Sequence, residues 1–169
     1  MNHFLTHLKL SFNKELILKE METITFDSTL FGDELLRGLI NNPSTPSEMR
    51  LQEMDNTPEI KKLYIQLKTL TKSNDIRARF FKQLANQELP FHQDKTTLCS
   101  INIVLSEEYN PIIFEGVDEI YYKCALINTQ SRHGVNAHPM ERIYLKFSIF
   151  DKSYKEVYDS LIMLKDHDR

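Results

Sequence analysis

The chain has 169 residues, of which 41% are hydrophobic, so it can bury one substantial core but has no length to spare for a second domain. Its 21 Lys and Arg residues against 24 Asp and Glu residues give a net charge of -3, and no segment concentrates basic residues, which argues against nucleic acid as a partner. No apolar run approaches the roughly 18 residues needed to cross a bilayer, and the first residues lack the basic flank and apolar run of a signal peptide. We therefore expect one domain over residues 1–169, cytoplasmic and not bound to membranes.

Residues 1–75 are predicted to be mainly helical and to support the rest of the domain. Prolines and small polar residues at 41–47 mark a loop within this part. The clearest helix follows Thr57, a residue type that can cap a helix, and Pro58 suits the first helical position. Apolar residues then recur at three- and four-residue spacing, which predicts a helix with one apolar face: Ile60, Leu63, Tyr64, Leu67 and Leu70.

Residues 76–151 are rich in short β-type segments separated by turns, and a closing helix is expected within residues 152–169. The predicted strands are residues 76–83, 98–105, 111–115, 119–129 and 142–150. Alternation along the second and last of these places apolar side chains on one face and polar ones, including Ser100, Asn102 and Arg142, on the other. If helices cover the apolar face, the polar face can line a cavity that holds a ligand.

The residues Pro-Phe-His-Gln-Asp at 90–94 place the imidazole of His92 and the carboxylate of Asp94 two positions apart. On an extended segment such side chains point to the same side, so the two groups are suited to bind one metal ion. A polar turn between two strands would have the same composition. The H-x-D pattern therefore needs a further ligand before it indicates a metal site.

A second group of residues supplies that ligand. His133 lies in the segment 128–136, and Arg142 follows it by nine residues at the start of the last predicted strand. This order of an H-x-D motif, a distal histidine and then an arginine resembles the double-stranded β-helix oxygenases that depend on iron(II) and 2-oxoglutarate. The resemblance covers approximately residues 77–151, close to half of the chain.

The resemblance implies an α+β fold, a double-stranded β-helix (jelly roll, cupin-like) with the N-terminal helices on the outer face of its major sheet. It implies that His92, Asp94 and His133 bind Fe(II) and leave three positions open, two for 2-oxoglutarate and one for O2. The guanidinium of Arg142 can then bind the far carboxylate of 2-oxoglutarate through two parallel hydrogen bonds. The place of Arg142 on the polar face of its strand agrees with this role.

Within the superfamily, residues 128–145 look most like the aspartyl/asparaginyl β-hydroxylase and free-amino-acid hydroxylase branch. Members of that branch commonly offer an arginine and a histidine to the co-substrate from the strand after the first metal motif, where this chain has Ser100 and Asn102. Together with Asn128, these two residues are expected to line the cavity as co-substrate contacts. Asp94 favours hydroxylation, because the related halogenases replace this carboxylate with a small residue.

Each of these residues also has a plainer interpretation. His133 could flank a hairpin with a satisfied hydrogen bond, and Arg142 could form a salt bridge with Glu141 or another surface acid. Arg79 could bind an acidic group of the substrate from the strand before the metal motif, or it could lie at a solvated edge. Three further positions could simply face water: Ser100, Asn102 and Asn128.

The sequence therefore predicts a 2-oxoglutarate-dependent dioxygenase that hydroxylates an amino acid, a peptide residue or another small molecule and releases succinate and CO2. The competing interpretation is a non-catalytic cupin-type protein that binds a metal for structure or sensing, and a scaffold without metal is a third. Arg142 separates the first two, because a sensor does not need a guanidinium directed at a dicarboxylate. Substrate identity and oligomeric state are left open.

Overall fold

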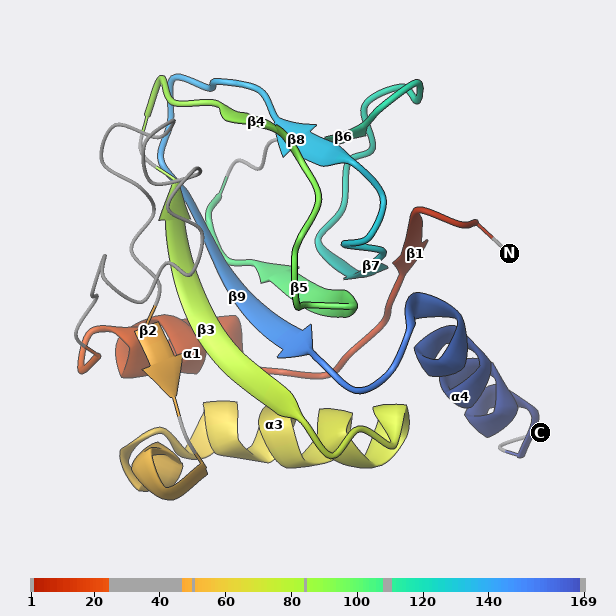
Figure 1. Ribbon diagram of the computed structural model, residues 1–169. Helices are drawn as coiled ribbons and strands as arrows, with labels where there is room; N and C mark the ends of the chain where they lie inside the picture. The colour runs from red at the N-terminus through yellow and green to blue at the C-terminus, as the bar shows by residue number, and fades with distance from the viewer. Residues whose placement is uncertain (1, 25–46, 50, 84, 108–110, 168–169) are drawn as a thin grey trace.

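The computed structural model describes residues 2–24, 47–49, 51–83, 85–107 and 111–167, and its strands form two antiparallel sheets (Figure 1). The larger sheet, in spatial order, contains β1 (Leu5–His7), β7 (Cys124–Ile127), β5 (Cys99–Val104), β9 (Arg142–Ile149), β3 (Ile76–Gln83) and β2 (Ser47–Met49). The smaller sheet contains β4 (Leu89–His92), β8 (His133–Val135) and β6 (Ile112–Phe114). The helices are α1 (Lys14–Met21), the 3-10 helix η2 (Leu51–Asn56), α3 (Pro58–Thr71) and α4 (Tyr154–His167).

One face of the larger sheet packs against helices, which lie on the side away from the smaller sheet (Figure 1). Because side chains alternate along a strand, β3, β5 and β9 turn a continuous set of apolar residues to this face. A single buried cluster joins helices and sheet; from α1 and α3 it includes Ile17, Met21, Ile60, Leu63 and Leu67, and from the strands Ala78, Phe80, Ile101, Ile103, Leu145 and Phe147. Among the described residues, no helix has both the length and the hydropathy to cross a membrane.

The opposite face of the larger sheet looks toward the smaller sheet and combines apolar and polar groups. Its apolar residues pack with the smaller sheet in a second buried cluster, in which Ile112 and Phe114 come from β6, Tyr122 precedes β7, and the larger sheet and its flanks supply Leu5, Val104, Ala125 and Ile127. Its polar part lies across β5, β9 and β3, where Asn102 is the register partner of Lys146 and Gln83 that of Arg142. The polar face expected from alternation is therefore interior, between the two sheets.

Several predicted elements agree with the structure and others need correction. Residues 76–83 are β3, and the segments predicted at 98–105, 111–115 and 142–150 each contain the observed strand. The strand predicted at 119–129 is too long, because only Cys124–Ile127 is a strand and Ile120 forms an isolated bridge to Ile112. Within the described part of residues 1–75, β1 and β2 join the larger sheet, alongside the helices α1, η2 and α3. The predicted loop at 41–47 lies outside the described residues except for Ser47, which begins β2.

The start of α3 is stabilised differently from the sequence-based expectation. Thr57 makes no side-chain capping bond, and its hydroxyl donates instead to the Met54 carbonyl at 3.2 Å. The carboxylate of Glu20, at the end of α1, accepts hydrogen bonds from the backbone N–H groups of Glu59 at 2.7 Å and Ile60 at 3.0 Å. An acid near a helix N-terminus satisfies unpaired N–H groups and complements the helix dipole. Glu20 thus joins α1 to α3 beneath the sheet.

Candidate metal centre

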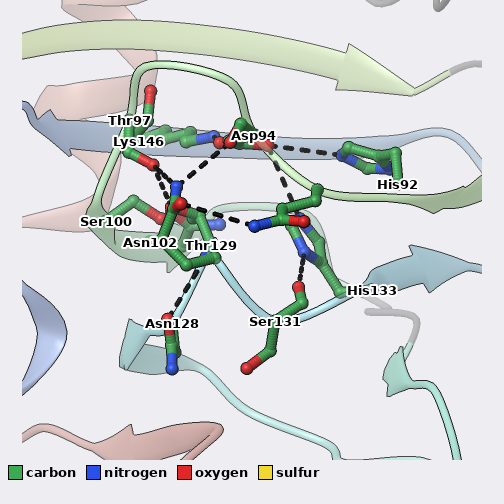
Figure 2. Close-up of polar contacts among 12 residues, drawn as sticks. His92, Asp94, Thr97, Ser100, Asn102, Asn128, Thr129, Ser131, His133 and Lys146 are labelled. Carbon is green, nitrogen blue, oxygen red and sulfur yellow. Dashed lines mark hydrogen bonds and ion pairs between the residues drawn. The ribbon is translucent and has the colours of Figure 1, made fainter.

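Three side chains with metal-binding groups meet at the inner side of the smaller sheet (Figure 2). His92 ends β4 and His133 begins β8, and the two residues are register partners in the antiparallel pair. Asp94 Oδ1 lies 3.4 Å from His92 Nε2 and 3.8 Å from His133 Nε2. One ligand atom from each residue lies within 4.8 Å of the others, so the three groups can hold a single ion.

Both imidazole rings are oriented by backbone carbonyls. Nδ1 of His92 lies 2.8 Å from the Pro90 carbonyl oxygen, and Nδ1 of His133 lies 2.8 Å from that of Ser131. A carbonyl oxygen only accepts hydrogen bonds, so Nδ1 carries the proton in each ring and Nε2 carries the free lone pair. Such a partner on the second nitrogen fixes the tautomer and the direction of a metal-ligating histidine.

The backbone of Asp94 is held to the segment before β8. Its N–H donates to the Thr129 carbonyl at 3.0 Å, and its own carbonyl accepts from the Gln130 side-chain amide at 3.0 Å. The same amide and the Thr129 hydroxyl both donate to the Thr97 carbonyl, each at 2.7 Å. These bonds join the segment that carries Asp94 to the one that leads to His133.

Close approach of β4 and β8 also requires Gly134. A Cβ atom at this position would lie 2.7 Å from the Leu89 carbonyl oxygen and 3.2 Å from the Phe91 nitrogen, both backbone atoms. Any side chain would therefore push the two strands apart. The glycine beside His133 allows the two histidines to face each other.

Burial and local charges keep Asp94 and His133 in the protonation states that a metal requires. Burial by itself would raise the pKa of Asp94, but the Lys146 ammonium and the two imidazoles outweigh it and hold that pKa well below the usual range. Burial lowers the pKa of His133 to about 4, although Asp94 opposes the shift. At neutral pH the carboxylate is therefore ionised and the His133 imidazole is neutral, as metal ligands must be.

Arg142 lies buried at the start of β9, with 3% of its surface exposed. Its Nη2 donates to the Tyr122 hydroxyl at 2.5 Å, and its guanidinium carbon lies 5.4 Å and 5.0 Å from the ring centroids of Tyr122 and Tyr144. Its Nε is buried and has no hydrogen-bond partner among the residues that the structure describes. No carboxylate in the described part of the chain pairs with it, so the plainer interpretation of a salt bridge with Glu141 is wrong.

The other predicted contact residues lie in different surroundings. Ser100 and Asn102 are buried and bonded to each other at 2.9 Å, and Asn102 also approaches the Tyr122 hydroxyl at 3.4 Å. Asn128 is partly buried and donates to the His3 carbonyl at 2.9 Å. Arg79 is the register partner of Lys146, and its guanidinium carbon lies 5.9 Å from the Phe150 ring centroid. The ligand-binding roles of all four remain predictions.

Sequence reasoning gave no role to Lys146 or Tyr122. Lys146 Nζ lies 3.1 Å from Asp94 Oδ2, and the Tyr122 hydroxyl receives the hydrogen bond from Arg142. Alternation along 142–150 already placed Lys146 on the polar face, but a lysine four residues after an arginine has no spacing rule that indicates a partner. Tyr122 precedes its strand, and no pattern marked it.

Solved structures of several hydroxylases are similar to this chain. The viral collagen prolyl hydroxylase vCPH from Paramecium bursaria Chlorella virus-1, in a 2OG complex, matches with a TM-score of 0.59 and 10% identity over 88% of this chain and 96% of its own. HygX from Streptomyces hygroscopicus, with nickel and 2-oxoglutarate bound, matches with a TM-score of 0.58 and 8% identity, covering 85% of this chain and 81% of its own. A prolyl hydroxylase from Trichoplax adhaerens, in complex with a hypoxia inducible factor peptide fragment, matches with a TM-score of 0.57 and 10% identity, covering 92% of this chain and 86% of its own.

These likenesses show that the chain has the same overall fold as these three proteins. No protein-family model and no curated protein matches the chain by sequence, so the likeness rests on the fold alone. Within this fold, the metal-binding cluster and the hydrogen bond of Arg142 are features of the chain's own geometry.

Proposed function

We propose that the protein is an Fe(II)- and 2-oxoglutarate-dependent dioxygenase that hydroxylates an amino acid, a peptide residue or another small molecule, releasing succinate and CO2. The observation that carries this proposal is the meeting of His92, Asp94 and His133 in a fold whose interior also holds Arg142, whose buried Nε has no hydrogen-bond partner among the described residues. When bound, iron and 2-oxoglutarate would supply the oxidising power that side chains lack, with O2 as the oxidant.

The donor set fits iron(II). Two neutral imidazoles and one carboxylate are the ligand types of the facial triad found in non-haem iron oxygenases. Each histidine has a backbone carbonyl on its second nitrogen, and the carboxylate is ionised. Those features favour binding a divalent cation over a purely structural hydrogen-bond cluster.

The surroundings of Arg142 fit the distal carboxylate of 2-oxoglutarate. A buried guanidinium with an unsatisfied Nε is costly unless an anion completes its hydrogen bonds. Arg142 precedes Lys146 by four residues on β9, so both project to the same side of the sheet. A short dicarboxylate held by Arg142 at one end can thus extend toward the metal cluster. Tyr122 orients the guanidinium for this contact.

The finer description of the fold belongs to the same proposal. We infer a double-stranded β-helix with the N-terminal helices on the outer face of its major sheet, which the common buried cluster of α1, α3 and the sheet supports. The domain division into residues 1–75, 76–151 and 152–169 follows from it. The similar structures are prolyl hydroxylases and HygX, and they lend no support to the aspartyl/asparaginyl hydroxylase branch. A peptide substrate is compatible with the peptide complex of the Trichoplax enzyme.

Calorimetric titration of 2-oxoglutarate tests the proposal. Purified protein is stripped of metal, divided, and titrated with and without Mn(II) as a stand-in for iron. We expect tight binding only in the presence of the metal, and loss of that binding in Arg142→Met. Metal uptake without 2-oxoglutarate binding would favour the cupin-type sensor, and absence of metal uptake would favour the scaffold.

A further inference from the structure

Lys146 occupies an unusual place beside the metal cluster. It lies on the inner face of β9, and its ammonium is 3.1 Å from Asp94 Oδ2 and 5.7 Å from the Phe81 ring centroid. The side chains of Lys146 and Asp94 are only 15% and 13% exposed. The ammonium therefore lies between the Phe81 ring and the carboxylate of Asp94, one of the three candidate ligands. Figure 2 shows its contact with Asp94.

The two oxygens of Asp94 have different neighbours. Oδ1 faces the Nε2 atoms of both histidines, at 3.4 Å and 3.8 Å, whereas Oδ2 faces Lys146. A carboxylate can bind a cation through one oxygen or through both. A charge-assisted hydrogen bond to Oδ2 favours the first mode, because that oxygen already has a partner.

We propose that Lys146 is a positioning residue of the metal centre, which restrains Asp94 to bind the metal through Oδ1 alone and so keeps a coordination position open for 2-oxoglutarate. This inference rests on the proposed function. A triad with three single-atom ligands leaves three positions, and a two-atom carboxylate would take one of them. Lys146 therefore acts on the co-substrate through Asp94 rather than by contact with it.

A simpler role for Lys146 would be to neutralise the buried charge of Asp94. That role matters mostly in metal-free protein, because a bound dication compensates the carboxylate directly. The two roles therefore differ in metal-loaded protein. Charge compensation alone leaves 2-oxoglutarate affinity unchanged there, whereas positioning does not.

The experiment measures Mn(II) affinity of stripped protein and 2-oxoglutarate affinity of Mn(II)-loaded protein, both by calorimetry. Lys146→Met removes the ammonium and keeps the length of the side chain, and Lys146→Arg keeps a charged donor. Lys123→Met, at an exposed position just before β7, is the matched control. All proteins are purified with Mn(II) present, and Lys146→Leu serves as a second neutral variant without a donor in case Lys146→Met does not fold.

In Lys146→Met we expect 2-oxoglutarate binding to weaken by about tenfold or more, comparable to the low end of the roughly 10- to 100-fold loss of metal affinity or activity that follows loss of a ligand's hydrogen-bond partner. Mn(II) affinity should change by less than about tenfold, since losing the restraint weakens binding while removing a nearby positive charge strengthens it. Lys146→Arg should recover most of the 2-oxoglutarate affinity, and Lys123→Met should match the wild type.

Unchanged 2-oxoglutarate affinity in the folded neutral variants would overturn the inference while leaving the proposed function intact. Loss of Mn(II) binding in those variants would overturn it as well, because Lys146 would then be required for the metal and not for the open position. A wild type that shows no metal-dependent binding of 2-oxoglutarate would refute the proposed function, and this inference with it.

Discussion

His92 and His133 face each other across the antiparallel pair of β4 and β8, with ring centroids 4.4 Å apart and each Nε2 within 4 Å of Asp94 Oδ1. Their register pairing sets this distance through the backbone, because directly opposed residues in an antiparallel sheet have neighbouring side chains. The two histidines are 41 residues apart in the sequence, yet neither requires a rearrangement to bind the same ion.

Replacing either histidine should remove the metal. His92→Ala or His133→Ala leaves two ligands of three, and we expect Mn(II) affinity to fall by more than the roughly 10- to 100-fold that follows loss of a ligand's hydrogen-bonding partner. Calorimetry on stripped protein measures this. His138→Ala is the matched control, since His138 lies in the loop between β8 and β9 and its Nδ1 accepts a hydrogen bond from the Met140 N–H at 3.1 Å. Equal metal affinity in all three variants would refute the assignment of ligands.

Replacing Arg142 should separate co-substrate binding from metal binding. Arg142→Met removes the guanidinium and fills much of its volume, so Mn(II) affinity should stay within a few fold. The dissociation constant for 2-oxoglutarate should rise about 100-fold, since two charge-assisted hydrogen bonds contribute roughly 3 kcal/mol. Arg132→Met is the comparison, because Arg132 is exposed and pairs with Glu115 on the surface. An Arg142→Met protein with wild-type 2-oxoglutarate affinity would contradict the role.

Acidification should destabilise the metal-free protein. The pKa of His133 is about 4 in the folded protein and about 6.5 in an unfolded chain, so between these values the unfolded state binds the extra proton. The free energy of unfolding should therefore fall as pH drops from about 6.5 to about 4, by up to roughly 3 kcal/mol.

Urea unfolding with a chelator present, at pH 7 and at pH 5, measures this dependence. In His133→Asn the replacement side chain does not titrate in this range. The free energy of unfolding of this variant should therefore change less between the two pH values than that of the wild type. A wild type with the same pH dependence as His133→Asn would show that His133 is not buried in its neutral form.

The cap supplied by Glu20 should contribute to stability without affecting the site. Glu20→Ala leaves two N–H groups of α3 without their partner and should lower the free energy of unfolding by about 1 kcal/mol. Glu22→Ala, an exposed position in the same part of the chain, is the control and should be nearly neutral. Thermal or urea unfolding measures the stability of both variants against the wild type. If the Mn(II) affinity of Glu20→Ala fell below that of the wild type, the helices would influence the metal centre more than the contacts indicate.

The parts of this fold that alternation could predict are the long strands. β3 and β9 are each eight residues long and carry regular alternation, so both were predicted closely. β4 and β8 have four and three residues, and β4 contains Pro90, so neither has enough length for a pattern. These two short strands nevertheless carry both histidines. The ligands could be predicted only because the spacing of residue types resembles a known family.

The sequence alone could not predict the residues whose roles depend on tertiary contacts. Lys146 matters because its strand passes beneath Asp94, and Tyr122 because its hydroxyl meets Arg142. The Glu20 cap is similar, since Glu20 accepts hydrogen bonds from residues that follow it by 39 and 40 positions in the chain. A local rule favoured Thr57 instead, and tertiary packing overrode it.

The central claim is that His92, Asp94, His133 and Arg142 form one site for a metal and 2-oxoglutarate that reacts with O2. Succinate release measures this most directly, with purified protein, Fe(II), ascorbate and 2-oxoglutarate in air, first alone and then with pools of amino acids and peptides. We predict succinate formation that requires both iron and O2 and is lost in His92→Ala and in Arg142→Met. Succinate formation that persists in both variants, or none with any pool, would contradict the account.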